Sequence, residues 1–233
     1  MLKILSIFLI STISFAQQNN AEKLLKDVKQ KFETVKDYEV NLNIEVDMEF
    51  LRIPNATAKA YFKQPDKMKI ESDDFAVLPK EGMNFSPTRL LNEKYTAIYV
   101  KSDTLQKNKV DVIKIIPLED TTNIVLSTLW IDTNEKIIRK IETTTKDRGS
   151  FKIELTYGTM KKYGLPQKML FHFSTPQSKL PQKLKDNNEI FKKPMDRLSK
   201  NFKGNIIIKY SDYKINIGLK DSFFTEKKKS LRK

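Results

Sequence analysis

The residues that could carry out chemistry are few and far apart. The chain of 233 residues contains one histidine, His172, and no cysteine. A metal site or a nucleophilic dyad needs several such side chains together, whereas His172 is an alternate residue of the apolar segment 169–173. Glu45 and Asp47 could in principle serve acid–base chemistry. Because they alternate with apolar residues, they are typical of the solvated face of a strand. We therefore expect no enzyme activity, no cofactor and no metal.

Glycine content and charge narrow the function classes further. The six glycines read as turns, strand ends or a strand interruption, so no glycine-rich phosphate loop is present. With 43 basic and 29 acidic residues, the formal net charge of +14 would suit nucleic acid, an anionic membrane surface or an acidic partner. No helix-turn-helix, zinc-finger or RNP-type aromatic motif occurs, and the first residues indicate export. We therefore expect no nucleic-acid partner.

Residues 1–16 have the pattern of a secretory signal peptide. They combine a positive Lys3, an apolar run too short to span a bilayer core of about 30 Å, and a small-residue cleavage site before Gln17. Without cysteine, the mature chain has no disulfide and no thiol for a lipid anchor. We expect a periplasmic, unanchored monomer: a signal peptide over 1–16, one domain over 17–225, and a basic tail over 226–233.

The stretch 38–50 organises the rest of the chain. Its apolar and polar residues alternate without interruption, so a strand here has one apolar and one polar face. Thirteen residues at about 3.3 Å each would span roughly 43 Å, and a strand that long must twist and curl. Its apolar positions are Tyr38, Val40, Leu42, Ile44, Val46, Met48 and Phe50.

The other elements form an antiparallel meander. An amphipathic helix is predicted over 20–36, and a short helix should begin at Pro87 after the cap Ser86. A basic, proline-containing loop is expected over 175–203. Alternation and turn residues predict about ten strands, over 38–50, 56–62, 68–71, 95–101, 110–117, 124–131, 136–145, 150–157, 167–174 and 204–219. The fold class is therefore mainly β, of the α+β type.

The order of these elements resembles a known family. Residues 59–69, KAYFKQPDKMK, are similar to its strand, x-Pro turn, strand signature. The segments Leu129–Asp132, Gly164–Pro166, Gly204–Ile208 and Asp212–Asn216 also resemble it, and the likeness covers nearly all of residues 20–225. The family is the LolA-like outer-membrane lipoprotein carriers, whose fold is shared by anchored acceptors and stress-sensing regulators.

The resemblance implies a strongly curved antiparallel sheet that forms a half-open barrel, with helices covering its mouth. It also implies a hydrophobic cavity that carries lipoprotein acyl chains across the periplasm. The sequence departs from the family pattern before the turn proline, where carriers typically have an arginine that helps to gate the cavity. Here that residue is Gln64.

The alternating stretch and the short helix supply the candidate binding residues. The alternatives are a sealed core in place of a cavity and a protein-interaction or sensor module in place of a carrier. In an open cavity, Ile44→Glu would impair lipid binding more than folding, whereas in a sealed core it would unfold the protein. We expect a cavity with Val40, Leu42, Ile44, Val46, Met48 and Phe50 as wall and Phe85, Leu90 and Leu91 as lid.

The partners follow from the cavity and the charge. The expected ligands are lipid or lipoprotein acyl chains, exchanged with membrane-bound donor or acceptor proteins. The basic loop 175–203 and the tail 226–233 favour transient, salt-dependent contact with anionic lipid headgroups.

The signal peptide supplies the first prediction. Intact-mass measurement of the exported protein should show a chain that begins at Gln17 and that a salt wash releases from membranes. An intact Met1 terminus, or membrane retention after the wash, would contradict it.

Overall fold

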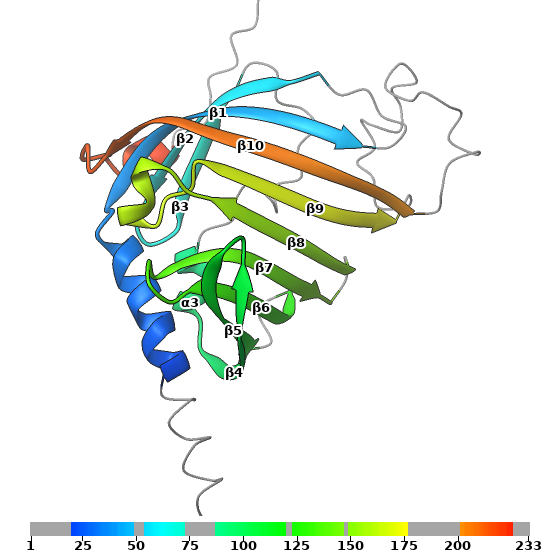
Figure 1. Cartoon of the computed structure of the whole chain (residues 1–233). Helices are drawn as coiled ribbons and strands as arrows, with labels where there is room; N and C mark the ends of the chain where they lie inside the picture. Colours follow the sequence, from blue (N-terminus) through cyan, green and yellow to red (C-terminus); the bar gives the residue numbers. More distant parts are fainter. Residues whose placement is uncertain are drawn as a thin grey trace, which may run out of the picture.

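The computed structural model describes residues 20–48, 54–72, 87–119, 123–146, 149–176 and 201–225. Ten antiparallel strands form one sheet that does not close into a barrel (Figure 1). This architecture confirms the mainly β, half-open sheet expected from the sequence. The signal-peptide and basic-tail predictions lie outside the described residues, since these begin at Asn20 and end at Thr225.

The strands follow the predicted order closely. They are β1 (Asp37–Met48), β2 (Ala56–Lys63), β3 (Lys67–Glu71), β4 (Tyr95–Leu105), β5 (Asn108–Pro117), β6 (Ile124–Asp132), β7 (Ile137–Thr145), β8 (Gly149–Thr156), β9 (Lys168–Pro176) and β10 (Asn201–Ile215). The helical elements are a helix over 20–33, α3 (Pro87–Asn92), the 3-10 helix η1 (Thr159–Tyr163) and α5 (Ser222–Thr225). No helix among the described residues is long and apolar enough to cross a membrane.

The last strand joins two blocks of the sheet. The strand order is β3-β2-β1-β10-β9-β8-β7-β6-β5-β4, so β10 returns from the end of the chain to lie between β1 and β9. The meander is therefore confirmed within each block, and β3 and β4 form the two edges. Ile44 shows the arrangement, since it lies opposite Ile208 on β10 and Ala56 on β2.

The described structure corrects the predicted basic loop at both ends. Residues 175 and 176 belong to β9 and residues 201–203 to β10, because β10 pairs with β9 from Asn201↔Pro176 onward. With 15 residues, β10 is longer than the 12-residue β1. The remainder of the predicted loop, 177–200, lies outside the described residues.

β10 also ends earlier than expected, at Ile215, because a buried carboxylate captures the chain after it. Asp37 is 4% exposed and accepts hydrogen bonds from the backbone N–H groups of Ile217, Gly218 and Leu219. Gly218 has φ +78°, a left-handed conformation that glycine adopts without a Cβ penalty. These bonds turn the chain away from the sheet before the predicted end at residue 219.

The N-terminal helix covers one end of the sheet. Leu25 and Phe32 are 0% and 3% exposed, and the Phe32 ring meets Phe62 of β2 edge-on at 5.5 Å. The helix ends at residue 33, three residues before the predicted end, and side chains from other elements bind the carbonyl groups of the two residues that follow it. The Asn216 amide donates to Thr34 O at 3.2 Å, and the Gln64 amide donates to Val35 O at 3.2 Å.

The β6–β7 turn contains a buried ion pair. Asp132 is 2% exposed and accepts hydrogen bonds from the backbone N–H groups of Asn134 and Glu135 and from the Arg139 guanidinium, at 2.7 to 3.0 Å. Burial raises the pKa of Asp132, but the hydrogen bonds to its charged form outweigh burial and leave the pKa below its ordinary value. The same turn receives the helix, since Lys31 Nζ donates to Glu135 O.

Asp132→Asn should destabilise the protein by about 2 kcal/mol, because it leaves the Arg139 charge without its partner. Since the folded pKa is lowered, the Asp132 contribution is present above the ordinary aspartate pKa and is lost as pH falls through the folded value. Urea midpoints measured against pH should show a smaller acid-induced loss in the variant. Glu33→Gln, in an exposed pair with Lys29, is the control and should behave like wild type. A midpoint of Asp132→Asn equal to wild type would contradict this role.

Candidate functional site

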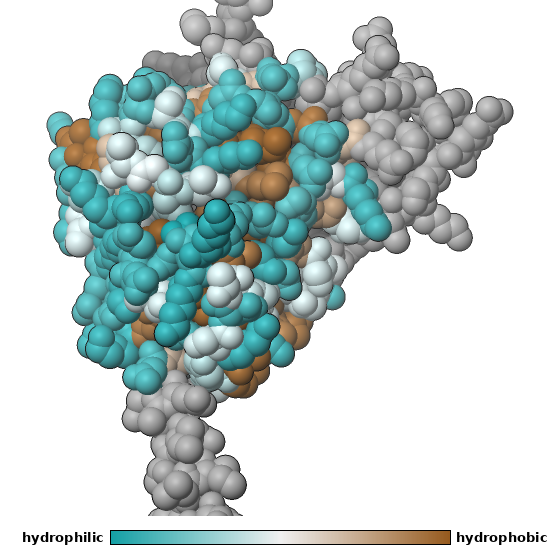
Figure 2. Space-filling view, viewed as in Figure 1, coloured by the Kyte–Doolittle hydropathy of each residue, from teal (hydrophilic) through white to brown (hydrophobic). Residues whose placement is uncertain are grey.

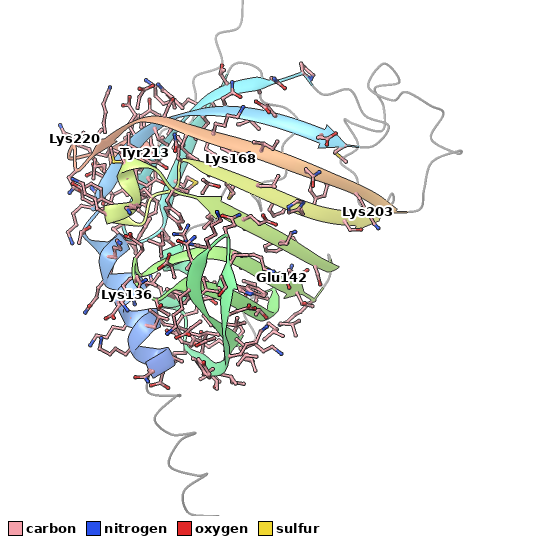
Figure 3. All side chains as sticks on the ribbon, viewed as in Figure 1. Lys136, Glu142, Lys168, Lys203, Tyr213 and Lys220 are labelled. Carbon is pink, nitrogen blue, oxygen red and sulfur yellow. The ribbon has the colours of Figure 1, made fainter. Side chains whose placement is uncertain are left out.

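The sheet has an apolar inner face, on which the helix over 20–33 packs, and a polar face turned to solvent. On β1 the two sets predicted from alternation are confirmed: Val40, Leu42 and Ile44 belong to the core, and Glu45 pairs with Lys209 on the polar face at 2.6 Å. Charged side chains cover the polar face, and Glu142, Lys168 and Lys203 lie along it (Figure 3).

The inner face is built in layers that run across the strands. The deep layer consists of Ile44, Ile208, Met169 and Leu155, which lie side by side by strand register and are 0 to 3% exposed. The middle layer lies one step nearer the strand ends, and only Val46 in it is half-buried. Its members are Val46, Ile206, Phe171, Ile153, Ile141 and Leu129.

The third layer, here called the rim layer, lies at the strand ends. It consists of Met48, Gly204, Phe173, Phe151, Thr143 and Ser127. Phe151 and Phe173 are only half-buried, and both rings lie against Phe171, at 5.3 and 5.7 Å. Ser127 and Thr143 are buried and share a hydrogen bond of 2.9 Å. The hydroxyl groups of Ser127 and Thr143 are therefore paired with each other, and the aromatic rings of Phe151 and Phe173 remain partly accessible.

Gly204 is the tightest point of the rim layer. A Cβ atom there would lie 2.6 Å from Met48 Cγ and 2.9 Å from Phe173 Cζ. The two neighbouring side chains thus close over the glycine from both sides and fill the place of its missing side chain.

The residues predicted to form the cavity wall fall into different layers. Val40, Leu42 and Ile44 are 0 to 5% exposed and sealed in the core, Val46 is half-buried, and Met48 is 7% exposed in the rim layer. Of the predicted lid on α3, Leu91 is buried in the core and Leu90 is half-buried against it. Phe50 and Phe85 lie outside the described residues.

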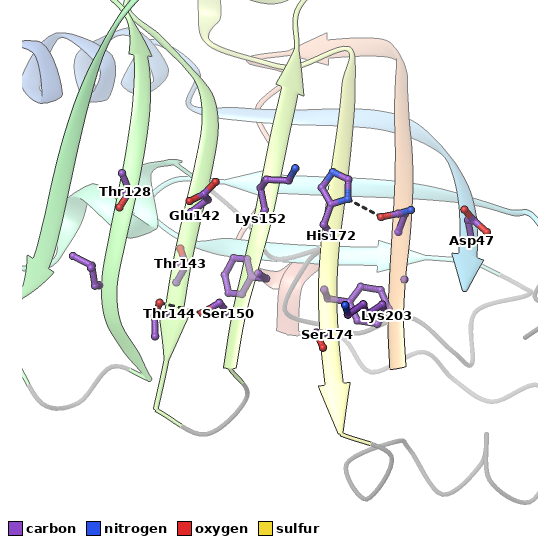
Figure 4. A pocket seen from close by; sticks show the side chains of 15 residues that line it. Asp47, Thr128, Glu142, Thr143, Thr144, Ser150, Lys152, His172, Ser174 and Lys203 are labelled. Carbon is purple, nitrogen blue, oxygen red and sulfur yellow. Dashed lines mark hydrogen bonds between the residues drawn. The ribbon is translucent and has the colours of Figure 1, made fainter. Parts of the chain in front are cut away.

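A hollow of about 730 Å³ borders the same strand ends (Figure 4). Four rim-layer residues line it: Thr143, Phe151, Phe173 and Gly204. The other lining residues are mostly polar: Asp47, Leu126, Thr128, Glu142, Thr144, Ser150, Lys152, His172, Ser174, Lys203 and Asn205. Strand alternation places these eleven residues on the polar face of the sheet, whereas the four rim-layer residues belong to the inner face, so the hollow lies mainly on the polar face at the strand ends.

His172 and its neighbours form the polar part of this lining. Its Nδ1 is 2.6 Å from Asn205 Oδ1, and its Nε2 is 3.5 Å from Glu154 Oε1. Hydrogen bonding from Lys152 lowers the pKa of Glu154 below its ordinary value. Sequence reasoning treated His172 as an ordinary strand residue and missed the hollow, because its lining comes from six strands and shows no local pattern.

Gln64, which replaces the arginine typical of carriers, supports the helix end. Besides the bond of its amide to Val35 O, its backbone N–H donates to Lys36 O at 2.8 Å. Gln64 is therefore a structural residue at the opposite end of β1 from the rim layer.

Within the described ranges, no group of three or more His, Cys, Asp or Glu side chains is placed to hold a metal ion. The half-buried rings of Phe151 and Phe173 could contribute apolar contact to a ligand at the strand ends.

Comparison with known proteins identifies the fold. No family model matches the sequence, and no curated protein is significantly similar to it. A domain assigned to outer membrane lipoprotein sorting, from Vibrio parahaemolyticus, has a TM-score of 0.55 at 13% identity, over 89% of this chain and 97% of that chain.

Two further solved structures agree with this result. A LolA superfamily protein from Nitrosomonas europaea has a TM-score of 0.57 at 10% identity, over 88% of this chain and 97% of that chain. A DUF1329 family protein from Desulfovibrio piger has a TM-score of 0.57 at 11% identity, over 89% and 96% of the two chains. At these identities the likeness shows a shared fold.

Gly204→Ala should strain the rim layer, because the new methyl group would displace Met48 or Phe173. We expect a loss of about 1–3 kcal/mol in the free energy of unfolding, as for other overpacked sites. Lys203→Ala, an exposed neighbour on the same strand, is the control. Equal urea midpoints for Gly204→Ala and wild type would contradict this prediction, because Met48 and Phe173 would then have moved aside without a loss of stability.

Proposed function

We propose that this chain, which has the LolA-like half-barrel fold, is a periplasmic carrier that binds the acyl chains of lipids or lipoproteins at the rim layer. The observation that carries the proposal is that Val46, Phe151 and Phe173 are only half-buried at the strand ends, next to a deep layer that is 0 to 3% exposed. An acyl chain that covers them would contribute about 0.8 kcal/mol for each methylene removed from water.

The hollow beside the rim layer matches an amphipathic ligand. Phe151 and Phe173 could supply apolar contact on the inner face, while Lys152, His172 and Lys203, on the polar face, could meet the polar or anionic headgroup of a ligand that passes over the strand ends. Its volume of about 730 Å³ falls in the range usual for sites that hold small ligands. A lipid carries both kinds of surface in one molecule.

The closure at Gly204 would let the site adapt. Met48 is unbranched and flexible, and methionine commonly lines surfaces that accept different apolar partners. Movement of Met48 and Phe173 away from Gly204 would open space over its backbone without disturbing the deep layer. Uptake and release would then need side-chain motion at the rim alone.

A carrier of this kind needs no catalytic residue and no cofactor. It exchanges its cargo with a membrane-bound donor and acceptor. The alternative from the sequence, an interaction or sensor module of the envelope, would use the same fold without lipid. Mass spectrometry of organic extracts from the purified protein separates the two, since only the carrier should retain lipid.

Three consecutive residues of β1 test the site. Val46→Glu should stay folded, because water reaches this position, and should weaken binding of a fluorescent fatty acid by about tenfold or more, since the ligand would have to desolvate the carboxylate. Ile44→Glu places a charge at a position that is 0% exposed and should unfold the protein, at a cost of several kcal/mol against a typical stability of about 5–15. Glu45→Gln, on the polar face, is the control and should change neither property.

Binding is measured by fluorescence titration, and folding by the emission of Trp130, the only tryptophan. Wild-type affinity in a folded Val46→Glu variant would remove the rim layer as the site. A folded wild-type protein that neither retains lipid nor binds the fatty acid would favour the interaction module.

A further inference from the structure

A second apolar surface lies on the opposite side of the sheet from the rim layer. Six large hydrophobic residues of the described chain are exposed, and five of them come from β4, β5, β6 and the loop after β5. We call these five the edge patch: Ile98, Val100, Ile116, Leu118 and Val125, which are 41%, 44%, 38%, 63% and 48% exposed. Brown, apolar residues reach the surface at the lower edge of Figure 2, where Figure 1 places β4 to β6.

The alternation of side chains along β4 and β5 places Ile98 and Ile116 of the edge patch on the solvent side of the sheet. On β4 the alternate residue Ala97 is buried in the core, so Ile98 points to the other face, and Ile116 does the same next to the core residue Ile115. Register shifts in the ladders fall at Val100 and at Val125. Bulges of this kind leave an extra residue unpaired in the ladder and redirect its side chain.

The edge patch is bordered by balanced charge. Lys101 and Lys114 lie next to Val100 and Ile98 in sequence and register, and Lys101 pairs with Asp103 at 2.8 Å. Lys94 and Glu119 lie beside Leu118. Leu118, the most exposed member, is held beside Lys94 by a bond from its N–H to Lys94 O at 2.9 Å. No local excess of negative charge therefore opposes an anionic partner, and the whole chain carries +14.

We infer that the edge patch docks this protein on an anionic lipid membrane, with Leu118 and Val125 entering the headgroup region. Five half-exposed side chains offer on the order of a few hundred Å² of apolar surface. A stable dimer usually needs about 800 Å² from each partner, so the edge patch is too small for a second copy. Insertion into a membrane interface needs only a few apolar side chains together with attraction between basic protein and anionic lipid.

The inference is independent of the proposed cargo, because the edge patch and the rim layer lie on opposite faces of the sheet. It also differs from the membrane contact expected of the basic loop and tail. Those clusters would act by charge alone, whereas the edge patch adds apolar contact that salt does not screen.

The chain's lack of cysteine allows a direct test. Leu118→Cys and Val125→Cys are each labelled with an environment-sensitive fluorophore and mixed with phosphatidylcholine vesicles that contain phosphatidylglycerol. Ile217→Cys, labelled in the same way, is the matched control, because Ile217 is 46% exposed but lies after β10, outside the edge patch. We expect a blue shift and quenching by lipid-borne quenchers at 118 and 125 and none at 217. Equal responses at all three positions, or none at any, would overturn the proposal.

A second variant measures the contribution of the edge patch. Leu118→Asp combined with Val125→Asp should lower vesicle partitioning by about tenfold or more, the equivalent of one aliphatic side chain left unburied. Because both positions are exposed, the thermal transition should stay that of wild type, and so should fatty-acid binding at the rim layer. Ile217→Asp should partition like wild type.

Unchanged partitioning in the double variant would overturn the inference. A sedimentation mass that doubles with concentration in wild type, and not in the double variant, would overturn it as well and assign the edge patch to a second copy. Loss of fatty-acid binding in the Val46→Glu variant with normal vesicle docking would show that the two sites act separately.

Discussion

The pairing of β1 with β10 is the constraint on which the rest of the structure depends. Ten residue pairs join the two strands, from Tyr38↔Ile215 to Met48↔Gly204. This ladder connects β1–β3 with the block β4–β9, which would otherwise be two separate sheets. Because both strands alternate in phase, their apolar sides form one continuous inner face, and the layers across the sheet follow from this register.

An open sheet with one apolar face must cover that face, and this chain covers it unevenly. The helix over 20–33 seals the end near Tyr38 and Phe62, where it is held by Gln64, Asn216 and the β6–β7 turn. At the other end, Phe151 and Phe173 keep part of their rings exposed. Within the described residues, the inner face is thus sealed where the helix over 20–33 packs on it and only half-buried at the strand ends.

The two faces of the sheet differ in the contacts they offer. The inner face has half-buried aromatic side chains at the rim layer, where the proposed cargo would bind, and the polar face carries ion pairs such as Glu45–Lys209 and Lys214–Glu39. The edge patch interrupts this division at β4–β6, where apolar residues lie on the solvent side. Because the proposed cargo site and the proposed membrane contact use different side chains, a substitution should remove either one while keeping the other.

The sequence by itself determined which residues share a face, because alternation with period two is a local property of each strand. It therefore predicted the strands, the inner set on β1 and, through the order of its motifs, the half-open fold. Only the tertiary structure decided that Ile44 is sealed while Val46, two residues on, is half-exposed. Burial depends on neighbours more than 120 residues away in the chain, such as Phe171 and Ile206. The same holds for Gly204, whose importance comes from Met48 and Phe173, and for Leu118, which no local pattern separates from an ordinary loop residue. Alternation assigns a side chain to a face, but the register and the elements packed on that face determine how much water still reaches it.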